Sequence, residues 1–206
     1  MMRLHTSLLL LSVVLACARS LCGQETEHGA KKTLEAVSPD GQFAFRITGE
    51  SSEEKQTYDL VDRKSGNVLM SVAESDPDLG PSARFNIKAL WRPDSKAFAI
   101  TAYLQKRGSE LLVYSRQDGT FRAIELPEME VEIPAKLEQG KTTNLNSQGA
   151  KRWLKDGSLV VEIATTSSGN GGTVTATRTV VLAFDKSGKA SIRKSSVKVS
   201  VEKADE

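Results

Sequence analysis

The sequence predicts an all-β fold made of three consecutive four-stranded antiparallel meanders. A short phrase that ends in an Asp turn and leads into an apolar strand occurs three times, and beyond the N-terminal segment no long stretch keeps a 3.6-residue apolar period. The turn aspartates lie 54 and 62 residues apart, a spacing typical of one supersecondary unit used repeatedly. The copies of the phrase are Ser38-Pro39-Asp40-Gly41, Trp91-Arg92-Pro93-Asp94-Ser95 and Trp153-Leu154-Lys155-Asp156-Gly157.

Each repeat is expected to contain a strand that ends in the phrase, a strand after the Asp turn, and two strands around a second turn that contains Gly. Gly accepts positive φ and Asp can bond its own backbone, which favours tight turns at all these places. The predicted strands are 43–47, 57–62, 67–72, 85–91, 97–103, 110–115, 121–125, 128–133, 159–165, 173–184 and 190–201. They form one β-domain, 33–201, with repeats at 33–73, 84–127 and 145–201, followed by a polar tail at 202–206.

The first two phrases, each followed by an apolar strand, resemble the blade repeat of bacterial WD40-like, TolB-type β-propellers. The resemblance covers most of residues 33–200 and implies blade-like meanders. The third phrase has Lys155 where the family has proline, and three meanders are fewer than the four to eight blades of an ordinary propeller. The prediction is therefore an incomplete propeller, with a β-sandwich or an open barrel as the alternative.

Residues 1–23 have the features of a signal peptide. Arg3 supplies a positive charge, residues 8–16 form a short apolar core, and Ala16 and Ala18 make a small-residue cleavage pattern. The apolar core is too short to span a bilayer, so the mature protein is expected to be periplasmic or secreted, with a polar linker at 24–32. Cleavage is expected after Ala18. In the alternative, residues 14–17 act as a lipobox and Cys17 becomes a lipidated first residue.

The residues that carry most enzymatic and metal chemistry are missing from the predicted domain. The two histidines, His5 and His28, lie in the leader and linker, and both cysteines lie in the leader. This excludes Ser-His-Asp and Cys-His catalysis and the usual zinc, copper and haem ligand sets. Residues 135–142 match the loosest form of a phosphate-binding loop but hold one glycine and precede a poor helix. We therefore predict no catalytic residue, no metal site and no cofactor.

Three features remain as candidates for packing or binding. Trp91 and Trp153 occupy equivalent repeat positions and are predicted to be core anchors. The glycine-rich stretch 167–172 is either a binding loop at one rim or a solvated hairpin connection. Alternating glutamates at 125–132 predict an acidic strip for docking, a solvated sheet face, or charges that protect a sheet edge. The candidate loop residues are Ser168, Gly169, Asn170 and Gly171.

The predicted function is binding. With a net charge of +2 and interspersed charges, the chain has no strong field to attract nucleic acid. We expect an exported non-enzymatic β-domain that binds a protein or an envelope polymer through loops at one rim. The alternatives are a carboxylate-based carbohydrate hydrolase and a structural protein of the envelope that associates with itself.

Overall fold

The structure, a computed structural model, describes residues 34–48, 56–74, 86–104, 108–169, 171–185 and 187–203. The predicted signal peptide and linker, with Cys17, and the candidate loop residue Asn170 lie outside these residues.

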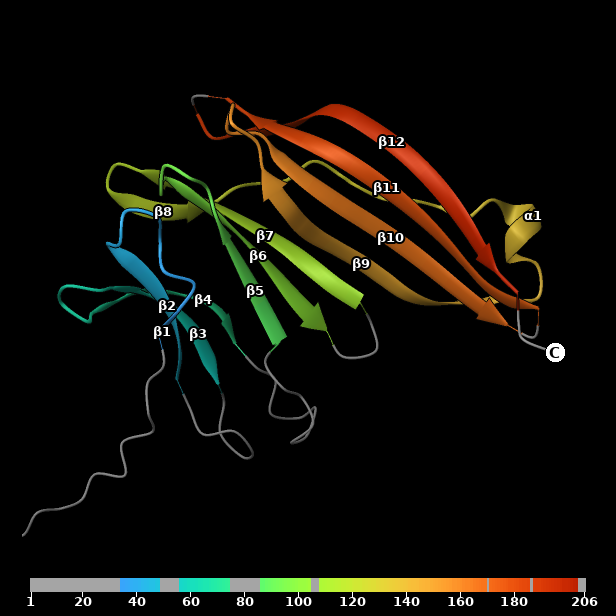
Figure 1. Cartoon of the computed structure of the whole chain (residues 1–206), viewed down its shortest axis with the longest axis horizontal. Coiled ribbons are helices and arrows are strands. Elements are labelled where there is room, and N and C mark those ends of the chain that lie inside the picture. The colour runs from blue at the N-terminus through green and yellow to red at the C-terminus, as the bar shows by residue number, and fades with distance from the viewer. Residues whose placement is uncertain are drawn as a thin grey trace, which may run out of the picture.

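The described chain folds into three consecutive antiparallel meanders of four strands each, which confirms the predicted fold class (Figure 1). The first contains β1 (Leu34–Glu35), β2 (Phe43–Thr48), β3 (Thr57–Asp62) and β4 (Val68–Glu74). The second contains β5 (Asn86–Trp91), β6 (Ala97–Leu104), β7 (Gly108–Gln117) and β8 (Thr120–Ala123). The third contains β9 (Thr142–Trp153), β10 (Leu159–Gly169), β11 (Gly172–Phe184) and β12 (Ala190–Glu202), and is preceded by the one-turn helix α1 (Ala135–Glu138).

The second and third meanders share one sheet through a short parallel contact. Gly108 and Ser109 at the start of β7 pair with Asn146 and Ser147 of β9, while the rest of β7 pairs with β6 and β8. In the described chain the strand order runs from β12 to β5 without closing into a ring. The architecture is that of an incomplete propeller.

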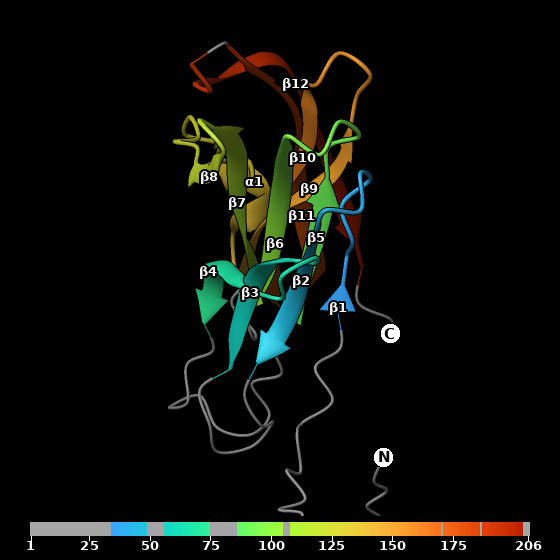
Figure 2. The same cartoon turned by 90° about the vertical axis from the view of Figure 1, so that its left-hand side faces the viewer.

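Strand β6 lies between the other two meanders and is buried on both faces. Because side chains alternate along a strand, Phe98 and Ile100 point into an aromatic-rich core shared with the first meander, whereas Ala99 points into an aliphatic core shared with the third. All three side chains are fully buried. Burial on both faces explains why β6 begins with four apolar residues in a row, 97–100. The second meander lies between the first and the third (Figure 2).

The three phrases form equivalent turns. The residues after the aspartates, Gly41, Ser95 and Gly157, all have positive φ, at 72°, 59° and 82°. In each turn the Asp Oδ1 accepts a hydrogen bond of 3.0 Å from the backbone N–H two residues later. The middle turn tolerates a serine in the left-handed conformation, and the buried Ser95 hydroxyl accepts a hydrogen bond from Asp40 N (3.0 Å) of the first turn.

The tryptophans link successive repeats by the same hydrogen bond. Trp91 Nε1 donates to Ala36 O (2.6 Å), and Trp153 Nε1 donates to Leu90 O (3.0 Å). Ala36 and Leu90 occupy equivalent positions, each three residues before the proline of its phrase. The first repeat has Val37 at the tryptophan position, and this side chain is 45% exposed. Each tryptophan therefore ties its own repeat to the repeat before it.

Acid should weaken these turns. Partial burial opposes ionisation of Asp40 and Asp94, but hydrogen bonds from neighbouring side chains and backbone outweigh it, and the pKa of each carboxyl falls below its ordinary 3.8. At Asp156 the hydrogen bond from Ser158 N and the contact with Arg193 lower the pKa. A carboxyl whose pKa is lowered by folding stabilises the protein above its unfolded pKa and loses that contribution as the pH falls through its folded pKa.

We expect the urea midpoint of unfolding to fall as the pH decreases from about 5 to about 2. Replacing all three turn aspartates by asparagine, whose Oδ1 still accepts the backbone N–H, should flatten this dependence. An equally steep pH dependence in the triple variant would contradict the assignment.

One predicted strand is wrong. Residues 128–133 form no strand. The strand that ends in the third phrase, which the repeat unit implied, is β9, a largely polar segment. Residues 124–134 form an extended segment without ladder pairing, which we call the strap. The strap runs along the third meander from β8 to α1 (Figure 1). Apolar and acidic residues do alternate along the strap. However, the strap packs against side chains of the third meander and does not pair with a strand.

Candidate functional site: an acidic groove under the strap

The strap buries one side and exposes the other. Met129, Val131 and Ile133 are 3%, 8% and 5% exposed and pack into the aliphatic core with residues of β10 and β11. Glu130 and Glu132 alternate with them and are exposed. The strands of the third meander are longer than those of the second, and the strap covers apolar side chains on them that would otherwise meet water.

Side chains of the sheet hold the strap backbone in place. Thr165 Oγ1 donates to Val131 O (2.7 Å), Gln148 Nε2 donates to Met129 O (3.3 Å), and Arg178 Nη1 donates to Glu130 O (2.9 Å). These three donors come from β10, β9 and β11. Backbone carbonyls that lack a strand partner still need donors, and the sheet supplies them through its side chains. These hydrogen bonds hold the strap backbone against the third meander.

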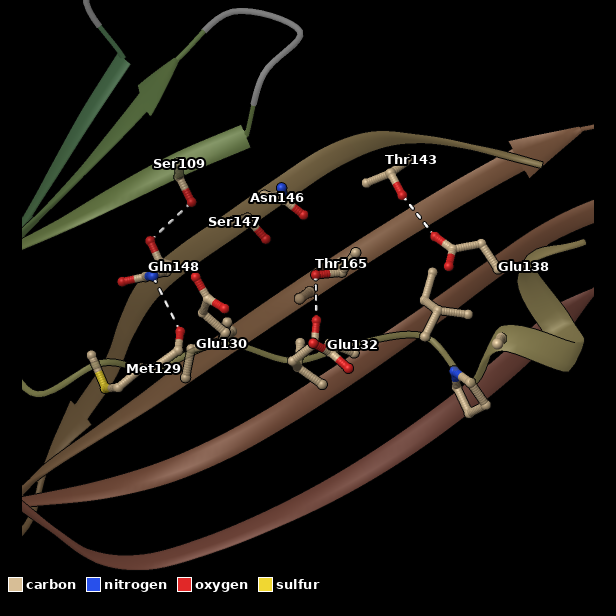
Figure 3. Close-up of a pocket in the computed structure, with 16 residues that line it drawn as sticks. Ser109, Met129, Glu130, Glu132, Glu138, Thr143, Asn146, Ser147, Gln148 and Thr165 are labelled. Carbon is tan, nitrogen blue, oxygen red and sulfur yellow. Dashed lines mark hydrogen bonds between the residues drawn. The ribbon is translucent and has the colours of Figure 1, made fainter.

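A groove of about 740 Å³ lies between the strap, α1 and strands β9 and β10 (Figure 3). Its floor is apolar where Ile163 and the strap side chains meet. Its polar wall consists of side chains from β9 and from the start of β7. The hydroxyl, amide and carboxamide groups of this wall belong to Ser109, Thr143, Asn146, Ser147 and Gln148.

The charge of the groove is entirely negative. Glu130, Glu132 and Glu138 line it, and none of its lining residues is Lys, Arg or His. The Glu138 carboxylate accepts hydrogen bonds from Thr143 Oγ1 (2.9 Å) and from Ser167 Oγ (3.4 Å). Hydrogen bonds therefore fix Glu138 at the end of the groove beside α1, whereas Glu130 and Glu132 are exposed and able to meet a ligand (Figure 3).

The polar wall is fixed at its centre by backbone contacts. Ser109 Oγ donates to Gln148 O (2.9 Å), next to the parallel pairing of β7 with β9. The Gln148 side chain reaches across to the strap. Gln148 of the third meander is thus hydrogen-bonded to both the second meander and the strap at this point.

The predicted rim loop is a hairpin end. Ser168 and Gly169 belong to β10, and Ser168 Oγ shares a hydrogen bond of 3.1 Å with Thr173 Oγ1 of β11. Gly171 follows in the turn. Ser167 is fully buried and contacts the groove through Glu138. The glycines of this stretch therefore mark a tight connection between two long strands.

The other predicted residues lie away from the groove. Asp40, Asp94 and Asp156 are in the repeat turns, and the half-buried Trp91 and Trp153 pack between repeats, so none of them lines it. Of the lining residues, the sequence indicated Glu130 and Glu132, as part of the acidic strip at 125–132, but not the residues of β9 and β10 that face them. The alternation of Glu130 and Glu132 with apolar residues was the available signal, but it was equally consistent with a strand.

The structure also bears on metal and nucleotide binding. Among the described residues, no group of three or more His, Cys, Asp or Glu side chains is placed to hold a metal ion. In the segment 135–142 the helix α1 comes first and β9 begins at its end, which reverses the strand–loop–helix order of a phosphate-binding loop. None of the helices described here is long and apolar enough to cross a membrane.

Comparison with known proteins gives a distant resemblance only. No protein-family model and no curated protein sequence matches the chain. The crystal structure of TolB from Acinetobacter baumannii is similar at 13% sequence identity and a TM-score of 0.34. The match covers 78% of this chain and 43% of that one, so the chain spans less than half the length of the TolB it matches.

Proposed function

We propose that this protein is an exported, non-enzymatic β-domain that binds a basic, extended segment of a partner protein in the groove under the strap. The observation that carries the proposal is the charge of the groove: three glutamates line it, and none of its lining residues is basic. The Arg178 guanidinium reaches the strap at the backbone carbonyl of Glu130. An acidic groove attracts Lys and Arg side chains and disfavours acidic ligands.

The shape and polarity of the groove suit an extended chain. Asn146, Ser147 and Gln148 offer donors and acceptors along β9, which can pair with the backbone of a peptide. The apolar floor accepts the methylene stems of Lys and Arg while their charged ends reach Glu130 and Glu132. Because these contacts involve the peptide backbone and basic side chains in general, the groove is expected to bind basic segments of different sequence.

Binding can be tested with a fluorescein-labelled octalysine peptide. We expect Glu130→Gln combined with Glu132→Gln to weaken binding about 3- to 10-fold at low salt, since exposed ion pairs contribute about 0.2–1 kcal/mol each. The readout is fluorescence anisotropy as protein is added. The matched control is Glu125→Gln combined with Glu35→Gln, which removes the same charge from exposed positions outside the groove and should change the affinity little.

Two results would contradict the proposal. Equal loss of affinity in both double variants would show that binding follows net charge and not the groove. Turnover of a soluble polysaccharide that Glu130→Gln or Glu132→Gln abolishes would replace the binding function by hydrolysis, for which a pair of carboxylates flanking the scissile bond is needed.

Export is supported by the leader, residues 1–23, and by its cleavage pattern at Ala16 and Ala18. The mass of the N-terminal peptide of protein recovered from the envelope distinguishes the two processing routes. Cleavage after Ala18 gives an unmodified peptide that begins at Arg19, whereas lipidation of Cys17 gives an acylated peptide whose formation globomycin blocks. An uncleaved leader on protein retained inside the cell would contradict export.

A further inference from the structure

The last strand of the third meander is a long free edge. Strand β12 pairs with β11, and in the described chain no strand pairs with its other side. It forms the outer border of the third meander in Figure 1. Of its thirteen residues, only Ala190 is buried and Val199 half-buried. A row of backbone N–H and C=O groups is therefore available along this edge.

Three common protections against edge pairing, namely short length, a central bulge and proline, are weak in β12. Edge strands are usually short, bulged or interrupted by proline. This strand contains no proline, and its one shift in register against β11 lies near its beginning, at Arg193. From Lys194 to Glu202 it is regular.

An exposed apolar row accompanies this regular part. Val197 and Val201 are 60% and 52% exposed, and Val199 between them packs against the aliphatic core. The register places Val201 opposite Val174 and Val199 opposite Ala176, both buried. The valine row is thus an uncovered continuation of the core-facing side of the third meander.

We propose that β12 pairs antiparallel with β12 of a second copy of this chain, with the two-fold axis passing through Val199. In this register Val197 lies opposite Val201 of the second copy, on both sides of the axis. Aliphatic side chains that are exposed in the monomer then cover one another, and the free backbone groups of 195–203 find partners.

The charges select this register over its neighbours. With the axis at Val199, Lys198 lies opposite Ser200 of the second copy and diagonal to its Glu202 and its Lys198, so no like charges are directly opposite. With the axis at Lys198, two lysines face each other, which is unfavourable. With the axis at Val197, Val201 lies opposite Arg193, where the strand is irregular.

The pairing has a consequence for the groove. A two-fold axis perpendicular to the sheet keeps both straps on the same face of the continuous sheet that joins the two third meanders. At about 4.8 Å between strands, the two β9 strands lie roughly 34 Å apart. Two basic segments of one partner could then bind simultaneously. The dimer itself does not depend on groove binding and is tested separately.

The first experiment measures mass in solution by sedimentation of the full chain. Wild type is expected to be a dimer. Val197→Lys combined with Val201→Lys places like charges directly opposite twice and should weaken the dimer about tenfold or more. Val197→Lys combined with Val201→Glu places opposite charges there and should restore it. Val68→Lys, at a similarly exposed valine of β4, is the control and should leave the dimer unchanged.

The second experiment tests the register by oxidative cross-linking in a background with Cys17→Ser and Cys22→Ser. Val199→Cys should cross-link across the axis, because directly opposite residues of antiparallel strands approach closely enough for a disulfide. Val197→Cys should not. A monomeric wild type, a dimer that survives the two lysine substitutions, or preferential cross-linking at Val197 would each overturn the proposal.

Discussion

Phe98→Ala is expected to lower the free energy of unfolding by about 3–5 kcal/mol. The Phe98 side chain is fully buried between the first and second meanders. Its ring lies 5.1 Å from that of Phe45, 5.0 Å from Trp91 and 4.9 Å from Tyr114, centroid to centroid. Truncation removes these contacts and leaves a cavity that the surrounding strands cannot fill.

Urea unfolding followed by tryptophan fluorescence measures this effect. Tyr103→Ala is the matched control, because Tyr103 lies on the same strand but is 46% exposed, and its removal should cost less than about 0.5 kcal/mol. Hydrogen exchange should lose more protection in β2 and β3 than in β10 and β11. A uniform or reversed pattern would contradict the role of Phe98 as the link between the first two meanders.

Gly108→Ala is expected to destabilise the protein by about 2–4 kcal/mol and to disrupt the groove. Gly108 has φ of +112°, and a Cβ placed there would overlap the backbone carbonyl of Asn146. This is the point at which β7 and β9 pair and at which Ser109 and Asn146 reach the groove wall. A side chain at this position must push the two strands apart.

The comparison that isolates this clash is Gly119→Ala. Gly119 has φ of +86°, but nothing lies within 4 Å of the Cβ that would be added, so the substitution carries only the backbone strain of about 1–2 kcal/mol. Thermal unfolding and octalysine binding should be measured for both variants. If the two alanine variants lose equal stability and both keep the wild-type affinity, the close contact with Asn146 is not a structural constraint.

The turns could be predicted from the sequence because their chemistry is local. Asp40, Asp94 and Asp156 each bond a backbone N–H two residues away, and the residue that follows each of them takes positive φ. A tetrapeptide contains all the atoms involved. This is why the repeat phrase predicted three meanders and their order along the chain.

The strap could not be predicted in the same way, because its partners are distant in sequence. A strand ending in the third phrase was implied by the repeat unit, but the length and pairing of β9 were not. Val131 O is bonded by Thr165 Oγ1, thirty-four residues later, so the alternation in the strap gave no information on whether a strand or side chains would satisfy its backbone. Strand β9 has few apolar residues, and its pairing depends on the long β10 beside it. The groove lies between the strap and β9, so it could not be predicted from either segment alone.

The site therefore lies where the repeat pattern stops. The turns and tryptophans hold the meanders in series, and the acidic groove is formed by the segment that connects the second meander with the third. The glycine-rich stretch 167–172 lies at the end of the β10–β11 hairpin, and a binding role for it stays a prediction.

The most direct test of the groove is a two-dimensional amide NMR titration of the isotope-labelled protein with unlabelled octalysine. The largest shift changes should occur at Glu130, Glu132, Thr143 and Asn146, and they should diminish as salt is added, since exposed charges are screened. Shift changes confined to the repeat turns around Asp40, Asp94 and Asp156, with none along the strap, would contradict the account.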